Sequence, residues 1–440
     1  MAGRPLLGKP GTSGRGWTWR ACGLRAPPMT LDTPTKEILA RIDGEAMLEQ
    51  VLDWAAVNSG TANLAGLATM AEKLGAAFAR LPGEVELVEP AAVTAIAADG
   101  SEFAKPHGRH MVLRVRPDAP RRVVLTGHMD TVFPADHAFQ SVAWIDEETI
   151  NGPGTADMKG GLCVLLHALQ AFEQSAGAEQ LGYDVMINSD EETGSLASRG
   201  LIEELAQGKY AALTYEPSAL PDGTLAHARG GTGNYSITVR GRSAHAGRNP
   251  QEGRNAIVAA SDLVLRLAAL AGEDLTVNPA KIEGGAANNV VPDLAILRFN
   301  IRPKTTAAME RFDGELDAVL RAVEAEHEVT ATRHGGVTRP PKPVDARAQK
   351  LFDLVRSCGA QLGREIGWQP TGGVCDGNNI AACGVPVVDT MGVRGGKIHS
   401  PEEFMIAPSL VERAALSALV LERLAAGDPL ADAVSAGEPS

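Results

Sequence analysis

The segment RVVLTGHMDTV, residues 122–132, decides the fold class of this chain. Its first half is a compact apolar run, which is typical of a strand buried inside a sheet. The segment GGLCVLLHALQAF, residues 160–172, follows with leucines at positions i, i+3, i+4 and i+7, the spacing of a helix with one buried face. Further buried strands are predicted at 183–189 and 211–215. Strands that alternate with helices predict an α/β fold with a mostly parallel sheet flanked by helices.

The pattern on either side predicts two domains. Helices are expected at 35–49 and 63–81, with a strand at 111–116 that exposes one face to solvent. The hydrophobic pattern of the sequence changes near Gly230. Apolar and polar residues alternate over 234–241, as in an antiparallel strand with one face exposed to solvent. A helix (254–271), a strand (295–302) and a helix (306–325) follow, and then the α/β pattern returns with elements at 346–362, 385–389 and 408–425. We therefore predict a catalytic domain of residues 30–227 and 337–426, interrupted by an α+β insertion of residues 228–336.

Composition limits the classes of function. The 440 residues include 44% hydrophobic residues, enough for a sizeable core, and carry a formal net charge of −13, which argues against a nucleic-acid or polybasic membrane partner. Five scattered cysteines without a CxxC spacing argue against a disulfide framework or a thiolate zinc site. No apolar run approaches the roughly 20 residues that span a bilayer. We expect a soluble cytoplasmic protein, with a disordered extension at 1–29 and a disordered tail at 427–440.

Five short segments place metal-binding residue types after strands or turns. They are GHMDTV at 127–132, GTADMKGG at 154–161, NSDEETGS at 188–195, YEPS at 215–218 and GKIHS at 396–400. Any one of them alone is more often an ordinary turn, and it is their occurrence together and in order that indicates a site. Parallel sheets bind ligands beyond the carboxyl ends of their strands, and carboxylates crowded there repel one another unless a cation neutralises them. Histidine with carboxylates and no cysteine suits zinc, cobalt or manganese.

With the motif SAHAG at 243–247, these segments resemble a known family over residues 40–425. It is the co-catalytic di-zinc metallopeptidases and deacylases, which include glutamate carboxypeptidase, aminoacylase, acetylornithine deacetylase and succinyl-diaminopimelate desuccinylase; the carboxypeptidase G type is the most similar. The resemblance implies a zinc-peptidase catalytic domain, an inserted lid and dimerisation domain, and two Zn²⁺ per subunit, with Co²⁺ or Mn²⁺ as alternatives. It implies that Asp157 bridges both ions, that His128 and Glu216 hold one, and that Glu192 and His399 hold the other.

The resemblance also implies roles for residues that do not bind metal. Glu191 is expected to be the general base, and Asp130 to orient the imidazole of His128 through a hydrogen bond. His245 is expected to stabilise the oxyanion, often from the partner subunit of a homodimer formed through the lid. Asn289 and Arg302 match positions that contact substrate, where Arg302 would bind a carboxylate; a surface salt bridge is the alternative for Arg302.

These residues predict a hydrolase that cleaves an amide bond next to a free carboxylate, in a peptide or an N-acyl amino acid. Cys375, in GGVCDGNN at 372–379, departs from the Thr or Ser that relatives carry before Asp376, so substrate equivalence with carboxypeptidase G does not follow. One alternative is a deacylase for acetylated or succinylated diamino acids. A second is a metal- or amino-acid-binding relative without activity, against which the presence of Glu191 argues, because a binding protein needs no base.

Overall fold

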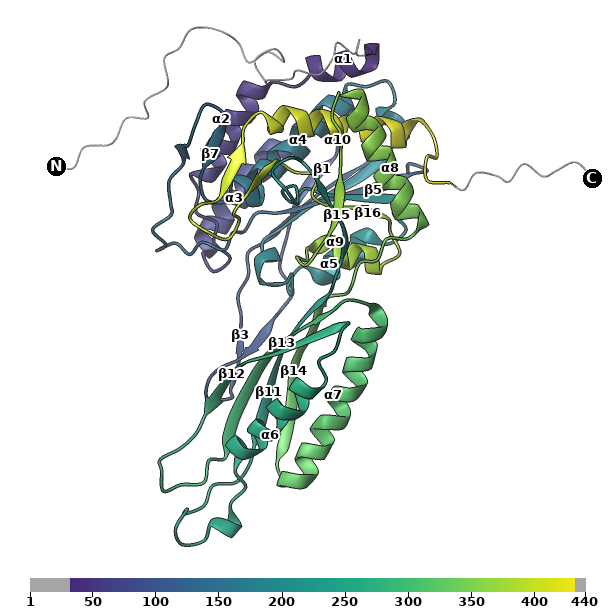
Figure 1. Ribbon diagram of the computed structural model, residues 1–440. Coiled ribbons are helices and arrows are strands. Elements are labelled where there is room, and N and C mark those ends of the chain that lie inside the picture. Colours follow the sequence, from purple (N-terminus) through teal and green to yellow (C-terminus); the bar gives the residue numbers. More distant parts are fainter. Residues whose placement is uncertain (1–31, 432–440) are drawn as a thin grey trace, which may run out of the picture.

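The computed structural model describes residues 32–431 and shows two units (Figure 1). One is built on a six-stranded sheet with helices around it, and the other is a four-stranded sheet with helices α6 and α7 along one side. The predicted extension at 1–29 and most of the predicted tail at 427–440 lie outside the described residues. Within those residues, no helix combines the length and the apolar character that crossing a bilayer requires.

The six-stranded sheet contains β5, β8 and β9, the strands that precede three of the predicted metal-binding segments. Its order is β1-β4-β8-β5-β9-β16, in which β8, β5, β9 and β16 are parallel neighbours and β1 and β4 are added antiparallel. The predicted α/β class is thus confirmed, with a parallel half and an antiparallel edge. The bounds are β1 Glu84–Val88, β4 His110–Val115, β5 Arg122–His128, β8 Gly182–Asn188, β9 Ala211–Thr214 and β16 Val387–Val388.

Helices cover both faces of this sheet because successive strand residues point to opposite sides. Val123 and Leu125 of β5 lie in one buried cluster with residues of six helices, to which α1 (Thr33–Ala40) contributes Ile38, whereas Val124 lies in another cluster with residues of two helices. The first face carries α2 (Gly44–Ala55), α3 (Leu64–Phe78), α4 (Gly160–Glu173), α8 (Ala346–Gln361) and α10 (Ser409–Ala426); the second carries α5 (Arg199–Ala206) and α9 (Asp376–Ala382).

Two local predictions were wrong. The single helix expected at 35–49 is two helices, α1 (Thr33–Ala40) and α2, because Asp43 adopts an extended backbone and its side chain accepts hydrogen bonds from the amides of Glu45 and Ala46. The strand expected to expose one face, β4, is buried on both, since it lies between β1 and β8 and helices pack over each side.

The inserted unit is an antiparallel sheet in the order β12-β13-β11-β14. The sequence predicts β11 and β13 but not the two edge strands, β12 and β14. β14 carries polar residues and glycines where a half-buried strand would show apolar alternation, and β12 alternates only over residues 275–278, before Pro279. β14 continues to Arg339, beyond the boundary expected at residue 336. The bounds are β11 Thr232–Arg240, α6 Ala256–Ala269, β12 Leu275–Gly284, β13 Leu294–Pro303, α7 Thr306–His327 and β14 Thr330–Arg339.

Three small sheets complete the described chain. β2 (Thr94–Ile96) and β3 (Glu102–Ala104) form a hairpin, and β10 (Leu225–Arg229) pairs with β15 (Trp368–Thr371). The third has the order β17-β18-β7-β6, with bounds β6 Ala143–Trp144, β7 Thr149–Asn151, β17 Gly395–Gly396 and β18 Phe404–Ile406. The turn between β17 and β18 contains His399, so this sheet fixes the last of the predicted ligand residues.

Gly161, at the start of α4, allows this helix to approach the end of β9. A methyl group on Gly161 would lie 1.9 Å from the carbonyl oxygen of Tyr215, whereas nothing lies within 4 Å of one on Gly200 in α5. Because backbone cannot move aside cheaply, we expect Gly161→Ala to lower the free energy of unfolding by more than about 2 kcal/mol. The matched Gly200→Ala variant should be unchanged or gain up to about 1 kcal/mol from the better helix propensity of alanine. Denaturant titration measures both, and equal stabilities for the two variants would contradict the close approach.

Candidate metal centre

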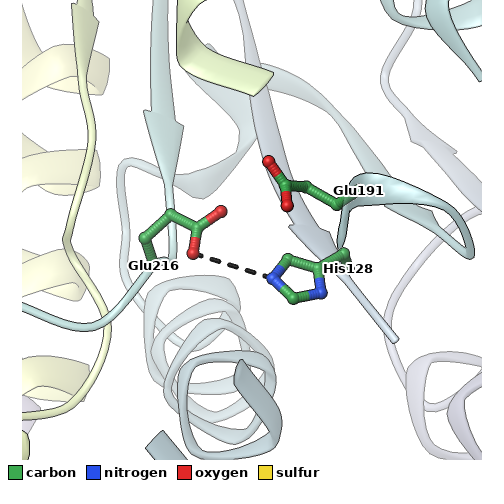
Figure 2. A group of neighbouring side chains, drawn as sticks. All are labelled: His128, Glu191 and Glu216. Carbon is green, nitrogen blue, oxygen red and sulfur yellow. Dashed lines mark ion pairs between the residues drawn. The ribbon is translucent and has the colours of Figure 1, made fainter. Parts of the chain in front are cut away.

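The parallel strands β5, β8 and β9 end at one edge of the six-stranded sheet and deliver polar side chains there. β5 ends at His128, the turn Glu191–Thr193 follows β8, and Glu216 follows β9. Figure 2 shows the side chains of His128, Glu191 and Glu216 pointing toward one another from these strand ends. The arrangement is the one expected when carboxyl ends of parallel strands form a binding crevice.

Asp157 lies between two histidines. Its Oδ1 is 3.1 Å from Nε2 of His128, and its Oδ2 is 3.3 Å from Nε2 of His399. On the first side, Oε2 of Glu216 lies 3.7 Å from Nε2 of His128; on the second, Oε2 of Glu192 lies 3.1 Å from Nε2 of His399. The structure therefore brings all five predicted ligand residues together, in two groups that share the carboxylate of Asp157.

The donor set fits divalent cations. Ligand atoms of His128, Asp157 and Glu192 all lie within 4.8 Å of one another, and so do those of His128, Glu191 and Glu216. Burial and the charge of Asp157 raise the pKa of Glu192 to about 7, while hydrogen bonds that the His399 imidazole donates to the carboxylates of Asp157 and Glu192 raise the pKa of His399 to about 11. Both shifts show that these carboxylates favour a neighbouring positive charge, which a cation between them would supply.

Asp130 ties His128 to the turn that carries Glu191. The Nδ1 of His128 lies 3.0 Å from the carbonyl oxygen of Asp130 and 3.3 Å from its Oδ1. The carboxylate also accepts hydrogen bonds of 3.2 Å from the amides of Glu191 and Glu192 and one of 2.7 Å from Oγ1 of Thr61. With Nδ1 donating to Asp130, the lone pair of Nε2 faces the site, as a metal ligand requires.

Glu403, which the sequence gave no reason to single out, holds the segment before α4. Its carboxylate accepts hydrogen bonds from the amides of Gly154 (3.1 Å), Ala156 (2.9 Å) and Asp157 (3.0 Å). The peptide bond between Asp157 and Met158 is cis. Glu403 lies 246 residues from Asp157 along the chain, so no local sequence pattern could have indicated this contact.

Arg339 is a second residue that sequence reasoning missed. Its side chain is 1% exposed, and Nη2 lies 2.9 Å from both Oε1 of Glu191 and Oδ1 of Asp376. The same nitrogen donates to Oγ of Ser195 at 2.8 Å, and Nη1 donates to Oδ1 of Asn379 at 3.0 Å. Since Arg339 ends β14, the last strand of the inserted unit, it connects that unit directly to the turn that carries Glu191.

A cavity of about 880 Å³ opens at the site. The residues around Asp157 form one wall, and Arg302 and Asn300 of β13 contribute to another, with Nε of Arg302 donating to Oδ1 of Asn300 at 3.0 Å. Cys375 also lines the cavity, and burial raises the pKa of its thiol well above the usual range. Burial thus favours the neutral thiol, which is a poor nucleophile, and Cys375 forms part of the pocket wall.

His245 and Asn289 lie away from the cavity that contains Asp157. Their loops meet where the amide of Ala246 donates to the carbonyl of Asn289 at 2.9 Å, beyond the end of the sheet at which Arg240 pairs with Leu294. Arg302 lies near the opposite end of β13, and residues 294 and 301 lie roughly 23 Å apart along an extended strand. Neither residue lines the cavity of its own chain, and both are exposed.

The charge network of Arg339 makes its removal costly. Arg339→Ala would leave Glu191 and Asp376 buried without their cation, so we expect a loss of about 3–5 kcal/mol in the free energy of unfolding. As a control, Arg311→Ala removes an exposed pair with Asp274, whose side chains are 45% and 41% exposed, and should cost less than about 1 kcal/mol. Urea denaturation of both variants tests the difference; similar losses would show that Arg339 is not the structural centre of this network.

Comparisons with known proteins agree with this geometry. Residues 124–423 match the family described as peptidase family M20/M25/M40. The chain is 29% identical to carboxypeptidase G2 of Pseudomonas sp. (strain RS-16) over 330 residues, covering 73% of this chain and 78% of that protein. It is 28% identical to succinyl-diaminopimelate desuccinylase of Acidovorax ebreus (strain TPSY) over 309 residues, covering 65% and 76%.

A dinuclear metal binding peptidase of Bacillus subtilis has the same fold, with a TM-score of 0.61 at 14% identity, over 87% of this chain and 98% of that one. The family match spans well over half of the 440 residues. The chain therefore belongs to peptidase family M20/M25/M40, and it is a metallo-hydrolase that acts on peptide or amide bonds.

Proposed function

We propose that this protein hydrolyses an amide bond next to a free carboxylate, in a peptide or an N-acyl amino acid, with two Zn²⁺ as the metal ions and Co²⁺ or Mn²⁺ as substitutes. The observation that carries the proposal is the position of Asp157 between His128 and His399, in a cavity that Arg302 also lines. In this proposal, His128 and Glu216 would hold one ion, Glu192 and His399 would hold the other, and Asp157 would contribute to both sites.

Bound divalent cations supply Lewis acidity and make a water molecule more acidic. Glu191 has the role of base. Its Oε1 is held by Arg339, while Oε2 makes no hydrogen bond to the described residues and is available to accept the proton of the attacking water. The water oxygen then bonds to the amide carbon, the C–N bond breaks, and Glu191 returns the proton to the leaving amine.

Arg302 has the role of binding the substrate carboxylate. Asn300 fixes only Nε of its guanidinium, so both Nη groups are available for the paired hydrogen bonds that a carboxylate accepts. This contact explains why the amide bond would be cleaved next to a free carboxylate. A surface salt bridge, the alternative for Arg302, has no support here, because no carboxylate of the described chain lies within ion-pair distance of Arg302.

His245 and Asn289 fit a homodimer in which the inserted unit of one subunit reaches the cavity of the other. Their position at the far end of the lid sheet, exposed and side by side, supports a contribution to the partner rather than to their own site. In this arrangement His245 donates to the carbonyl oxygen as it gains negative charge, and Asn289 contacts the substrate. A cytoplasmic location is part of the proposal, and it agrees with four free cysteines among the described residues.

The substitution Glu191→Gln tests whether Glu191 acts as the general base. The substitution keeps the shape of the side chain and can still accept from Arg339, so both metal ions should remain bound while turnover of a dipeptide or N-acyl amino acid falls by at least about 10². Elemental analysis and steady-state kinetics measure the two effects, and a chelator should abolish the activity of the parent protein. Persistent turnover in the variant would remove Glu191 from the role of base, and activity that survives chelation would remove the metal mechanism.

Mixing subunits tests the contribution of His245 to the partner. His245→Ala and Glu191→Gln variants should each be nearly inactive alone. A mixed dimer contains one site with an intact Glu191 and a partner's intact His245, so mixing should restore up to about a quarter of the parent activity if subunits exchange at random and the restored site acts alone. No recovery, in a mixture whose exchange is verified by native mass spectrometry, would contradict the shared site.

A further inference from the structure

A second cavity lies beside the catalytic one, and the hairpin β2–β3 builds it. The hairpin leaves the catalytic unit between β1 and β4 and reaches the face of the lid sheet opposite α6 and α7, where Figure 1 shows β3 beside the lid strands. Side chains of the lid hold it through its carbonyl oxygens: Arg298 Nη2 donates to Ile96 at 2.7 Å, His334 Nε2 to Thr94 at 3.0 Å and Arg240 Nη2 to Gly100 at 3.0 Å.

This hairpin cavity, about 570 Å³ in volume, adjoins the catalytic cavity. Thr193, Asn234, Asn300 and Thr338 line both. Asn300 donates to Oδ1 of Asn234 at 2.8 Å and accepts from Nε of Arg302, so the boundary between the two cavities lies next to the guanidinium that the proposed function assigns to the substrate carboxylate. A group attached near that carboxylate could pass the two asparagines into the hairpin cavity.

The lining of the hairpin cavity favours a negative ligand. It contains Lys105, Arg199, Arg298 and His334 and no aspartate or glutamate, in a chain with a net charge of −13. Two acids behind the lining neutralise the arginines, since Glu203 pairs with Arg199 at 2.8 Å and Glu283 with Arg298 at 2.7 Å. Lys105 has no carboxylate within ion-pair distance among the described residues, so its ammonium is the cation left for a ligand.

We propose that the hairpin cavity is a subsite for a second anionic group of the substrate, a carboxylate or a phosphate, carried by the same part of the molecule as the carboxylate bound to Arg302. The assignment rests on the proposed function, because Arg302 fixes where the substrate ends. Lys105 is the specificity-determining cation. Asn234 and Asn300 guide the side group of the substrate from the catalytic cavity into the hairpin cavity. Substrates with a second anionic group are therefore bound more tightly than uncharged substrates of the same shape.

Binding to the zinc-loaded Glu191→Gln protein tests this subsite without depending on turnover. Calorimetry compares N-acetyl-L-glutamate with N-acetyl-L-glutamine, and N-acetyl-O-phospho-L-serine with N-acetyl-L-serine. A charge-assisted contact predicts at least about tenfold tighter binding of the anionic member of one pair. A preference in the first pair identifies a carboxylate subsite and one in the second a phosphate subsite; equal affinities within both pairs overturn the proposal.

Substitution of Lys105 tests whether this residue causes the tighter binding of the anionic ligand. In the same background, Lys105→Met should reduce the preference to about threefold or less while leaving the uncharged ligand unaffected, and Lys105→Arg should restore it. Lys73→Met, which removes a cation on α3 that pairs with Asp53 of α2, serves as the control and should change neither affinity. A preference that survives Lys105→Met overturns the assignment. If the preference is present but the parent protein hydrolyses none of these compounds, the subsite stands and the proposed substrate class fails.

Discussion

A single carboxylate, that of Asp157, faces two imidazoles, and the rest of the catalytic unit is arranged around this contact. His128 reaches Asp157 from a strand end of the six-stranded sheet, and His399 reaches it from a turn of a separate small sheet more than 200 residues later. The acids near this contact, Glu192 and Glu216, would repel Asp157 in the absence of positive charge. Residues from five separate segments can converge here only because each is held at a fixed strand end or turn.

A surrounding set of polar side chains holds these charged residues in place. Asp130 binds both the ring of His128 and the backbone that carries Glu191, and Glu403 binds the backbone amides that lead into Asp157. Arg339 joins Glu191 to Asp376 and belongs to the last strand of the lid. Glu191, the proposed base, is therefore positioned by a residue of the inserted unit, so a change in the position of the lid relative to the catalytic sheet would directly affect the position of Glu191. The hairpin β2–β3 adds a second connection between the two units.

The sequence predicted much of this arrangement because the relevant signals are local. The buried strands around β5 are short apolar runs, and the residues at their ends form motifs that can be recognised without knowledge of the contacts between them. The α/β class and the convergence of His128, Asp157, Glu192, Glu216 and His399 were accessible for that reason. The family match sets aside the alternative of a binding protein without activity.

The features that the sequence did not reveal depend on distant partners. Arg339 lies 148 residues from Glu191, and nothing in its own segment distinguishes it from a surface arginine. The edge strand β14 has no apolar alternation, and the edge strand β12 has it only over residues 275–278. The alternation in β4 suggested an exposed face because the helices that cover it, α5 and α9, come later in the chain. The hairpin cavity is lined by residues from several separate segments, so no spacing in the sequence indicates it.

Anomalous X-ray diffraction from crystals of the zinc-loaded protein tests the central claim most directly. The account predicts two peaks about 3.5–4 Å apart, one on each side of the carboxylate of Asp157, with His128 and Glu216 at one and Glu192 and His399 at the other. A single peak, or peaks that do not contact Asp157 in a protein saturated with zinc, would contradict it.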